Sequence, residues 1–225
     1  MSINKKYSVV AIVATAAVSA SSQAEFLGYD ADVTTVGAYT VLNVNAVFSS
    51  GSDVALNIYE TEIGTLDNGG FNHSDTAFGS GGSWAFSSTV DIPGFADSTI
   101  DSYVTMGNGG AALDPGFGDG NGSSIPGGAG WYNGNPNNQQ TGSVYGGGIE
   151  EISGYAVALG QFVFETARAE SYIGDPFFSF AGEIGYSDDN GVAFGAGSIT
   201  WTAVPAPGAM ALFGLAGLSA RRRRG

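Results

Sequence analysis

Short segments in which apolar and polar residues alternate constrain this chain more than any other feature. From Val41 to Phe48 the even positions are all apolar and the odd positions are mixed, a period of two that is typical of a half-buried β-strand. The same period continues from Val54 to Tyr59, after a Ser/Gly/Asp turn at 49–53. We therefore expect these two strands to pair as an antiparallel hairpin.

Further stretches rich in β-branched and aromatic residues are bounded by Gly, Pro, Asn or Asp and predict more strands. These stretches are Trp84–Ile92, Thr99–Met106, Ile152–Phe164, Phe177–Gly185 and Val192–Thr202. Only Glu165–Tyr172 has a pattern typical of a helical turn. The sequence thus predicts an all-β fold, a single antiparallel β-sandwich or jelly-roll-like domain over residues 25–203.

A Gly/Asn/Pro-rich stretch interrupts this domain at residues 107–148. A segment of that length without regular structure is uncommon in a compact domain and is typical of a functional loop or of a flexible insertion. Trp131 and Tyr132 favour partial order, because aromatic side chains tend to pack against a domain or to contact a ligand.

The chain contains no cysteine, which excludes a disulfide framework, a thiolate nucleophile and a cysteine-based metal site. Its stability must therefore come from its core. The 14 Phe, 10 Tyr and 3 Trp residues are enough to build such a core in a domain of about 180 residues.

The N-terminus has the three parts of a secretory signal peptide. Lys5 and Lys6 precede an apolar run at 7–18, and small residues lead up to Ala24. We expect signal peptidase to remove residues 1–24, cutting after Ala24, so the protein is predicted to be exported.

The C-terminus combines a Pro-containing motif at 204–207, an apolar stretch at 208–220 and a terminal Arg cluster. As a helix the apolar stretch is only about 20 Å long, which is short for a permanent membrane span. The arginines favour the cytoplasmic side of the membrane. The residues that carry this pattern are Val204, Pro205, Pro207, Arg221, Arg222, Arg223 and Arg224.

This three-part tail resembles the PEP-CTERM sorting signal, with Val-Pro-Ala-Pro standing where that family has Pro-Glu-Pro. The resemblance covers about a tenth of the chain and implies that an exosortase-type membrane protease removes residues 204–225 after export. The protein would then be anchored only transiently in the inner membrane before it reaches the cell surface or the extracellular space. A short anchor helix that is simply retained is the alternative interpretation.

Without its two ends the chain is strongly acidic. Arg168 is the only basic residue between the predicted cleavage points, against 21 acidic residues. Such a surface repels nucleic acid and anionic lipid, which excludes nucleic-acid binding, and it favours solubility and binding of divalent cations.

Calcium is the one metal that the sequence favours, because Ca²⁺ prefers clustered oxygen ligands on turns. Two turn-forming segments offer them, and the candidate ligands are Asp114, Asp119, Asn121 and Asp188. Neither segment has the spacing of an EF-hand loop, and Asp/Asn/Gly clusters form turns without any metal. No other cofactor is predicted.

Catalytic candidates are few. His73 is the only histidine, and no nucleophile motif accompanies it, so a loop histidine that is solvated or bonded to Asp75 is the simpler interpretation. Paired carboxylates could support glycoside hydrolysis, although the spacing does not choose among them and exposed surface acids are the simpler alternative. The carboxylate candidates are Glu150, Glu151, Glu165, Glu170 and Glu183.

We therefore predict a non-enzymatic structural or adhesive protein, associated with exopolysaccharide or a biofilm matrix. The alternative is a carbohydrate-binding module or a carbohydrate-active enzyme with the same fold and destination. An exposed platform of aromatic residues such as Trp84, Trp131 and Tyr132, or two carboxyl groups roughly 5–10 Å apart in a cleft, would favour that alternative. Burial of these aromatic residues in the core is their usual fate.

Overall fold

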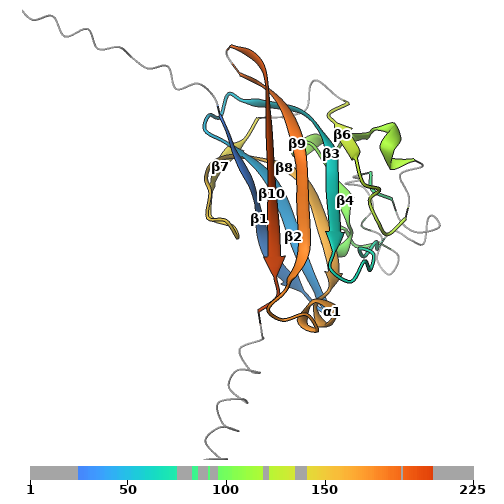
Figure 1. Ribbon diagram of the computed structural model, residues 1–225. Helices are drawn as coiled ribbons and strands as arrows, with labels where there is room; N and C mark the ends of the chain where they lie inside the picture. The colour runs from blue at the N-terminus through green and yellow to red at the C-terminus, as the bar shows by residue number, and fades with distance from the viewer. Residues whose placement is uncertain are drawn as a thin grey trace, which may run out of the picture.

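A computed structural model describes residues 25–74, 83–85, 91, 96–118, 122–134, 141–188 and 190–204 of this chain. Two antiparallel five-stranded sheets face each other across one hydrophobic core (Figure 1). Within the described residues the only α-helix is the five-residue α1 (Thr166–Glu170). The prediction of an all-β, sandwich-like fold with a single helical turn is confirmed.

The first sheet has the order β1–β2–β8–β4, and β7 pairs with β8 beside β4. Its strands are β1 (Phe26–Val36), β2 (Tyr39–Phe48), β4 (Tyr103–Val104), β7 (Ser143–Gly146) and β8 (Ser153–Glu165). The second sheet has the order β10–β9–β3–β6–β5. Its strands are β3 (Val54–Thr65), β5 (Ala112–Leu113), β6 (Ala129–Tyr132), β9 (Pro176–Asp188) and β10 (Gly191–Thr202).

The predicted hairpin between the strands at 41–48 and 54–59 is wrong. Both segments are strands, but β2 and β3 lie in opposite sheets, because the turn at 49–53 carries the chain across the sandwich. Each strand pairs instead with a partner of thirteen residues, β2 with β8 and β3 with β9.

The other strand predictions have mixed outcomes. Those at 152–164, 177–185 and 192–202 are confirmed as β8, β9 and β10. The one at 99–106 shrinks to β4, preceded by the 3₁₀ helix η2 (Ser98–Ile100), and most of the one at 84–92 lies outside the described residues. Strand β1 was not predicted, since Asp30, Asp32 and two threonines interrupt its apolar pattern.

The Gly/Asn/Pro-rich stretch at 107–148 is partly ordered, as Trp131 and Tyr132 indicated. Its described parts hold three short strands, β5, β6 and β7, and the 3₁₀ helices η3 (Gly107–Gly109) and η4 (Pro115–Phe117). Trp131 is completely buried, and its Nε1 donates a 2.8 Å hydrogen bond to the Thr105 carbonyl. This bond ties β6 of the second sheet to the segment that follows β4 of the first.

The core-facing residues of β8 change phase partway along the strand. Val157 and Leu159 belong to the core at odd positions, whereas Phe162 and Phe164 belong to it at even positions. The pairing with β2 skips Leu159, which marks a β-bulge there. A one-residue shift turns every later side chain to the opposite face of the sheet. The bulge therefore keeps all four apolar side chains on the core side.

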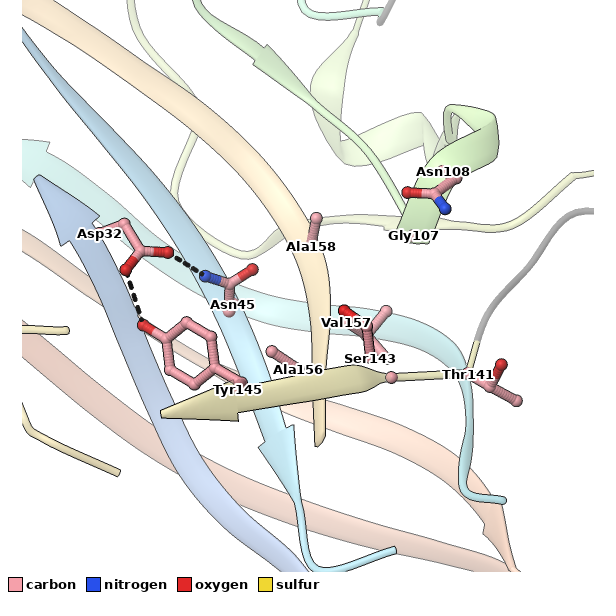
Figure 2. Close-up of a pocket in the computed structure, with 11 residues that line it drawn as sticks. Asp32, Asn45, Gly107, Asn108, Thr141, Ser143, Tyr145, Ala156, Val157 and Ala158 are labelled. Atoms are coloured by element: carbon pink, nitrogen blue, oxygen red, sulfur yellow. Dashed lines mark hydrogen bonds between the residues drawn. The ribbon is translucent and has the colours of Figure 1, made fainter. Parts of the chain in front are cut away.

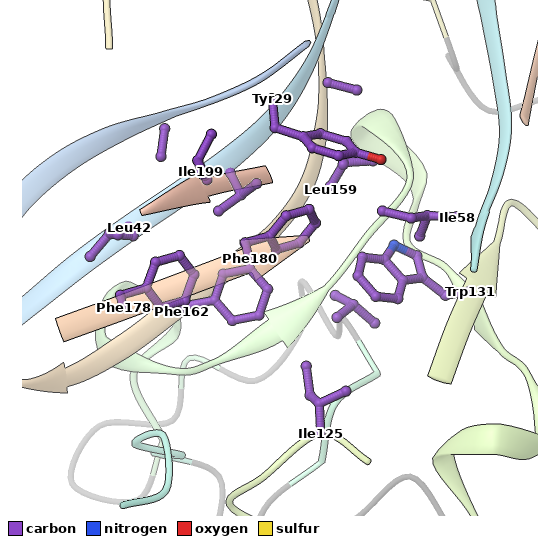
Figure 3. Packing of buried hydrophobic residues seen from close by; sticks show 14 of the residues in the cluster. Tyr29, Leu42, Ile58, Ile125, Trp131, Leu159, Phe162, Phe178, Phe180 and Ile199 are labelled. Atoms are coloured by element: carbon purple, nitrogen blue, oxygen red, sulfur yellow. The ribbon is translucent and has the colours of Figure 1, made fainter. Parts of the chain in front are cut away.

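Aromatic rings from both sheets meet in the middle of the sandwich (Figure 3). The ring centroids of Phe162 on β8 and Phe180 on β9 are 5.9 Å apart, so these two residues join the sheets directly. Tyr29 approaches Phe180 at 5.0 Å edge to face, and Phe178 approaches Phe162 at 5.4 Å. Edge-to-face and tilted contacts of this kind are favoured by the ring quadrupoles and add to the free energy of burial.

Arg168 closes one end of the sandwich. Its Nε lies 2.9 Å from Oδ2 of Asp67, and its terminal nitrogens donate to the carbonyls of Gly69 and Gly70 at 3.1 and 2.7 Å. The guanidinium also lies 5.3 Å from the ring centroid of Phe177. The single cation of the acidic domain thus fastens the turn after β3 to helix α1.

The carboxyl group of Asp67 responds to this arrangement. Partial burial alone would raise the pKa of Asp67, but hydrogen bonds from the Gly69 N–H and the Thr65 hydroxyl, together with the Arg168 charge, lower it. A carboxyl whose pKa is lower in the folded than in the unfolded state stabilises the fold above about pH 4. That contribution is lost as the pH falls through the lowered pKa.

We expect Arg168→Ala to reduce the free energy of unfolding by about 1–3 kcal/mol, because charge-assisted hydrogen bonds are lost and Asp67 loses its counter-charge. Thermal unfolding at neutral pH should show a fall in Tm of several degrees. The difference from the wild type should narrow below about pH 4, where Asp67 becomes protonated in the unfolded chain. Glu165→Ala, which removes an exposed charge just before α1, is the control, and an Arg168→Ala variant as stable as this control would contradict the expectation.

Candidate functional site

A polar cavity of about 390 Å³ lies on the outer side of the first sheet (Figure 2). Its floor includes the small side chains of Ala156 and Ala158, which flank the core residue Val157 along β8. The polar side chains around it come from several elements that are far apart in the sequence. They are Asp32 of β1, Asn45 of β2, Asn108 of η3, Thr141, and Ser143 and Tyr145 of β7.

Strands β1 and β2 supply the acidic and amide groups of this cavity. In β2 the apolar even positions face the core, so Asn43 and Asn45 lie on the outer face. The Asn45 Nδ2 donates to Oδ2 of Asp32 at 3.4 Å and to the Asn43 carbonyl at 3.2 Å. These contacts hold the amide of Asn45 in a defined orientation at the cavity wall.

Tyr145 completes the wall from β7. Its hydroxyl donates a 3.3 Å hydrogen bond to Oδ1 of Asp32, as Figure 2 shows. Burial, and then the negative charges of Asp30 and Asp32, raise the pKa of Tyr145. Like an ordinary tyrosine, it is protonated at physiological pH, so its hydroxyl can donate to Asp32. Gly148 is required beside it, because its φ is +122° and a Cβ there would collide with the Asp30 carboxylate and the Tyr145 hydroxyl.

Asp30 lies beneath this wall and is completely buried. Its carboxylate accepts hydrogen bonds from three backbone N–H groups, those of Ala31, Glu150 and Ile152, at 2.7, 2.9 and 3.0 Å. The Ile149 N–H donates to the Ala31 carbonyl at 3.0 Å. The turn at 147–152, which joins β7 to β8, is thereby fixed against β1, and it holds Tyr145 at the cavity.

The predicted calcium ligands do not form one group in the described structure. Asp114 caps η4, accepting from the Gly116 N–H at 2.8 Å, and Asp188 accepts from the Asn190 N–H at 2.6 Å in the turn between β9 and β10. Asp114 follows β5, which is three strands from β9 in the second sheet, a separation of about 14 Å. Asp119 and Asn121 lie outside the described residues. A calcium site at either turn stays a prediction.

No cluster of three or more His, Asp or Glu side chains that could hold a metal ion occurs within the described ranges.

His73 is buried, so the expectation of a solvated loop histidine is wrong. Its side chain is 1% exposed, its Nδ1 lies 3.5 Å from Oδ1 of Asp101, and its ring meets Trp84 edge to face at 4.7 Å. Asp75, the expected partner, lies outside the described residues. The position of His73 at an aromatic contact in the core fits a structural role.

The candidate carboxylates fall in three separate parts of the sandwich, with Glu165 and Glu170 at the two ends of α1. Glu150 and Glu151 lie in the turn before β8, not on a strand, and Glu165 ends that strand, about 40 Å away. Glu170 ends α1, and Glu183 is exposed on β9 of the other sheet. Neither Glu165 nor Glu183 can therefore form a glycosidase pair with Glu150 or Glu151.

Two of the three aromatic residues considered for a binding platform belong to the core. Trp84 and Trp131 are completely buried, whereas Tyr132 is 46% exposed. The cavity residues Asp32, Asn45 and Tyr145 were not among the predicted site residues. The signal available for them was weak: asparagines at two alternate positions of an otherwise apolar strand.

The predicted sorting elements lie mostly outside the described residues. The residues outside the described ranges are Ala24, Pro205, Pro207 and the arginines at 221–224. Val204 is described and is 76% exposed. Among the helices in the described part of the chain, none is long and apolar enough to cross a membrane.

Comparison with protein-family models, with curated proteins and with solved structures finds no match for this chain. Its function is therefore inferred from its own residues and geometry.

We expect Asp30→Ala to destabilise the protein by about 2–4 kcal/mol, because three backbone N–H groups lose a charged acceptor. Urea unfolding measures the loss, and hydrogen exchange should show faster exchange at the amides of Glu150 and Ile152. Asp32→Ala removes an exposed acid two residues along the same strand and two longer side-chain hydrogen bonds, of 3.3 and 3.4 Å, so it should cost much less stability. If the two amides kept their protection in Asp30→Ala, the proposed anchoring of the turn would be wrong.

Proposed function

We propose that this chain is an exported, non-enzymatic adhesive protein of the cell surface or extracellular matrix, whose folded domain binds exopolysaccharide. Residues 1–24 would act as its signal peptide, and the tail at 204–225 would direct it to an exosortase-type protease. The alternative is a carbohydrate-binding module or a carbohydrate-active enzyme that acts on extracellular polysaccharide. The polar cavity on the first sheet is the observation that carries the binding part of this proposal.

The composition of the cavity suits a sugar. Its volume of about 390 Å³ is in the range of small-molecule sites. Hydroxyl-rich ligands need paired donors and acceptors, and the wall offers both: the Asp32 carboxylate and the Asn45 Oδ1 accept, and the hydroxyls of Thr141 and Ser143 can donate and accept. The ring of Tyr145 supplies an apolar surface next to these groups (Figure 2). Such a mixture matches the alternating hydroxyl groups and C–H surfaces of a sugar ring.

The negative charge of the domain indicates which class of glycan the cavity would bind. Asp32 lies at the cavity and Asp30 lies beneath it, while the one cation of the domain, Arg168, is occupied by Asp67 at the end of the sandwich. An anionic ligand would meet repulsion without a compensating positive group. We therefore propose neutral glycans, rather than acidic ones, as the ligands of this cavity.

We expect Asp32→Ala to weaken glycan binding at least roughly tenfold, because a buried sugar hydroxyl would lose its charged acceptor. Calorimetric titration with neutral oligosaccharides, and with the polysaccharide isolated from the producing cells, measures the affinity. Tyr145→Phe should weaken binding less, since the ring remains.

Val144→Ser is the matched control for these variants. Val144 lies between the two cavity residues of β7 and is 84% exposed, so its removal should leave binding unchanged. Equal loss in all three variants, or wild-type binding in Asp32→Ala, would place the glycan elsewhere. Release of shorter sugars from the polysaccharide would favour the enzyme alternative.

Processing of the tail is a separate prediction. Intact-mass measurement of the protein recovered from outside the producing cells should give a chain that lacks residues 1–24 and the arginines at 221–224. Deleting those four arginines should leave the protein unsorted and reduce the amount at the surface. A recovered protein that still carries them would show a retained anchor in place of a cleaved signal.

A further inference from the structure

Strand β10 presents a long, uncharged edge. It covers Gly191–Thr202, twelve residues without any charge or proline, and it is the terminal strand of the second sheet. Its only recorded strand partner is β9, and among the described residues no backbone hydrogen bond from another segment reaches it. An edge strand offers unpaired N–H and C=O groups, and proteins usually protect long ones with charges, prolines, bulges or a covering loop.

Strand β1, the corresponding long edge of the first sheet, has these protections. It carries Asp30 and Asp32, and its pairing with β2 shifts register near Phe26. The turn at 147–152 also covers it, with the Ile149 N–H donating to the Ala31 carbonyl. In β10 the only register shift lies at the last two residues. The β1 edge is therefore blocked in three ways. No described segment pairs with the outer backbone groups of β10, although β1 packs against its inner face.

We propose that the β10 edge is a self-association surface, on which β10 of a second copy of this chain adds antiparallel to form one sheet across two molecules. A second copy fits for an electrostatic reason. Charged surface elsewhere on this acidic domain repels another copy, whereas β10 brings no charge to the contact. Two antiparallel copies of one strand are related by a twofold axis, which closes the assembly as a dimer.

The side chains along β10 fit this arrangement. Val192 and Phe194 are 63% and 65% exposed on its outer face. Antiparallel pairing over the whole strand places the twofold axis near residues 196–197, so these apolar side chains would pack beside the uncharged residues 198–202 of the second copy. On the inner face, Gly195 and Gly197 let the rings of Phe26 and Tyr29 from β1 pack closely beneath the strand.

Dimerisation would give the assembly two copies of any binding site on the domain. A bivalent particle binds a polymer more tightly than a single domain does and can join two polymer chains. The proposed dimer contact involves only the β10 edge, so it does not depend on whether the cavity binds glycans.

Sedimentation of the exported protein, as recovered from the producing cells, tests the proposal over a range of concentrations. We expect a monomer–dimer equilibrium that tightens as NaCl is raised from about 0.05 to 0.5 M, because salt screens the repulsion between two acidic domains. A dimer held by ion pairs would weaken instead. A protein that remains monomeric at millimolar concentration and high salt would overturn the proposal.

Substitutions at Ser198 locate the contact. Its side chain is exposed near the middle of β10 and lies opposite the small residue Ala181, and Glu183 is a diagonal neighbour on the same face. Ser198→Glu should weaken dimerisation at least roughly tenfold, since the two new carboxylates would lie close to the twofold axis, as near neighbours of like charge across the contact. Ser198→Gln, of similar size but neutral, should keep the dimer, and Val144→Glu on β7 should keep it as well.

Circular dichroism should show that all three variants are folded. Hydrogen exchange of the wild-type protein is a second, independent measurement. Amides of β10 should become protected as the protein concentration is raised, while those of β1 should not change. A dimer that persists unchanged in Ser198→Glu, or that protects β1 and leaves β10 exposed, would overturn the assignment of the edge.

Discussion

Aromatic packing between the two sheets is the interaction on which the rest of this structure depends. The chain has no disulfide to restrict its unfolded state, and many of its residues are glycines that contribute no side chain to a core. Large rings compensate, because each buries far more apolar area than an aliphatic side chain. Phe162 and Phe180 meet at the centre, and Tyr29, Phe178 and Trp131 extend the contact to both sheets.

Because the aromatic rings point into the core, the outer surfaces of the two sheets can carry different side chains. On the first sheet the outward asparagines of β2 and the acids of β1 meet the β7–β8 hairpin and enclose a polar cavity. On the second sheet the outer strand β10 carries no charge, and no segment among the described residues hydrogen-bonds to its outer edge. The same sandwich thus separates a recognition surface, proposed for glycans, from an edge proposed for a second copy.

The predictions from sequence succeeded where a strand has a continuous apolar pattern. Strands β2, β8, β9 and β10 have one, and burial of that pattern is nearly independent of which strand lies beside it. They failed for the β2–β3 hairpin, because pairing depends on partners more than a hundred residues away, β8 and β9. Strand β1 was missed because two acids interrupt it, and those acids belong to the cavity and its support.

By itself the sequence determined the all-β class, the aromatic core without disulfides and the acidic character of the domain, since these follow from composition and from a period of two. Only the tertiary structure decided which strands pair, where Asp32, Asn45 and Tyr145 meet, and which edge stays open. The physical reason is the separation along the sequence of the residues involved. Alternation is a property of neighbouring residues, whereas a cavity or an edge exists only after segments from β1 to β10 have been brought together by packing in the core.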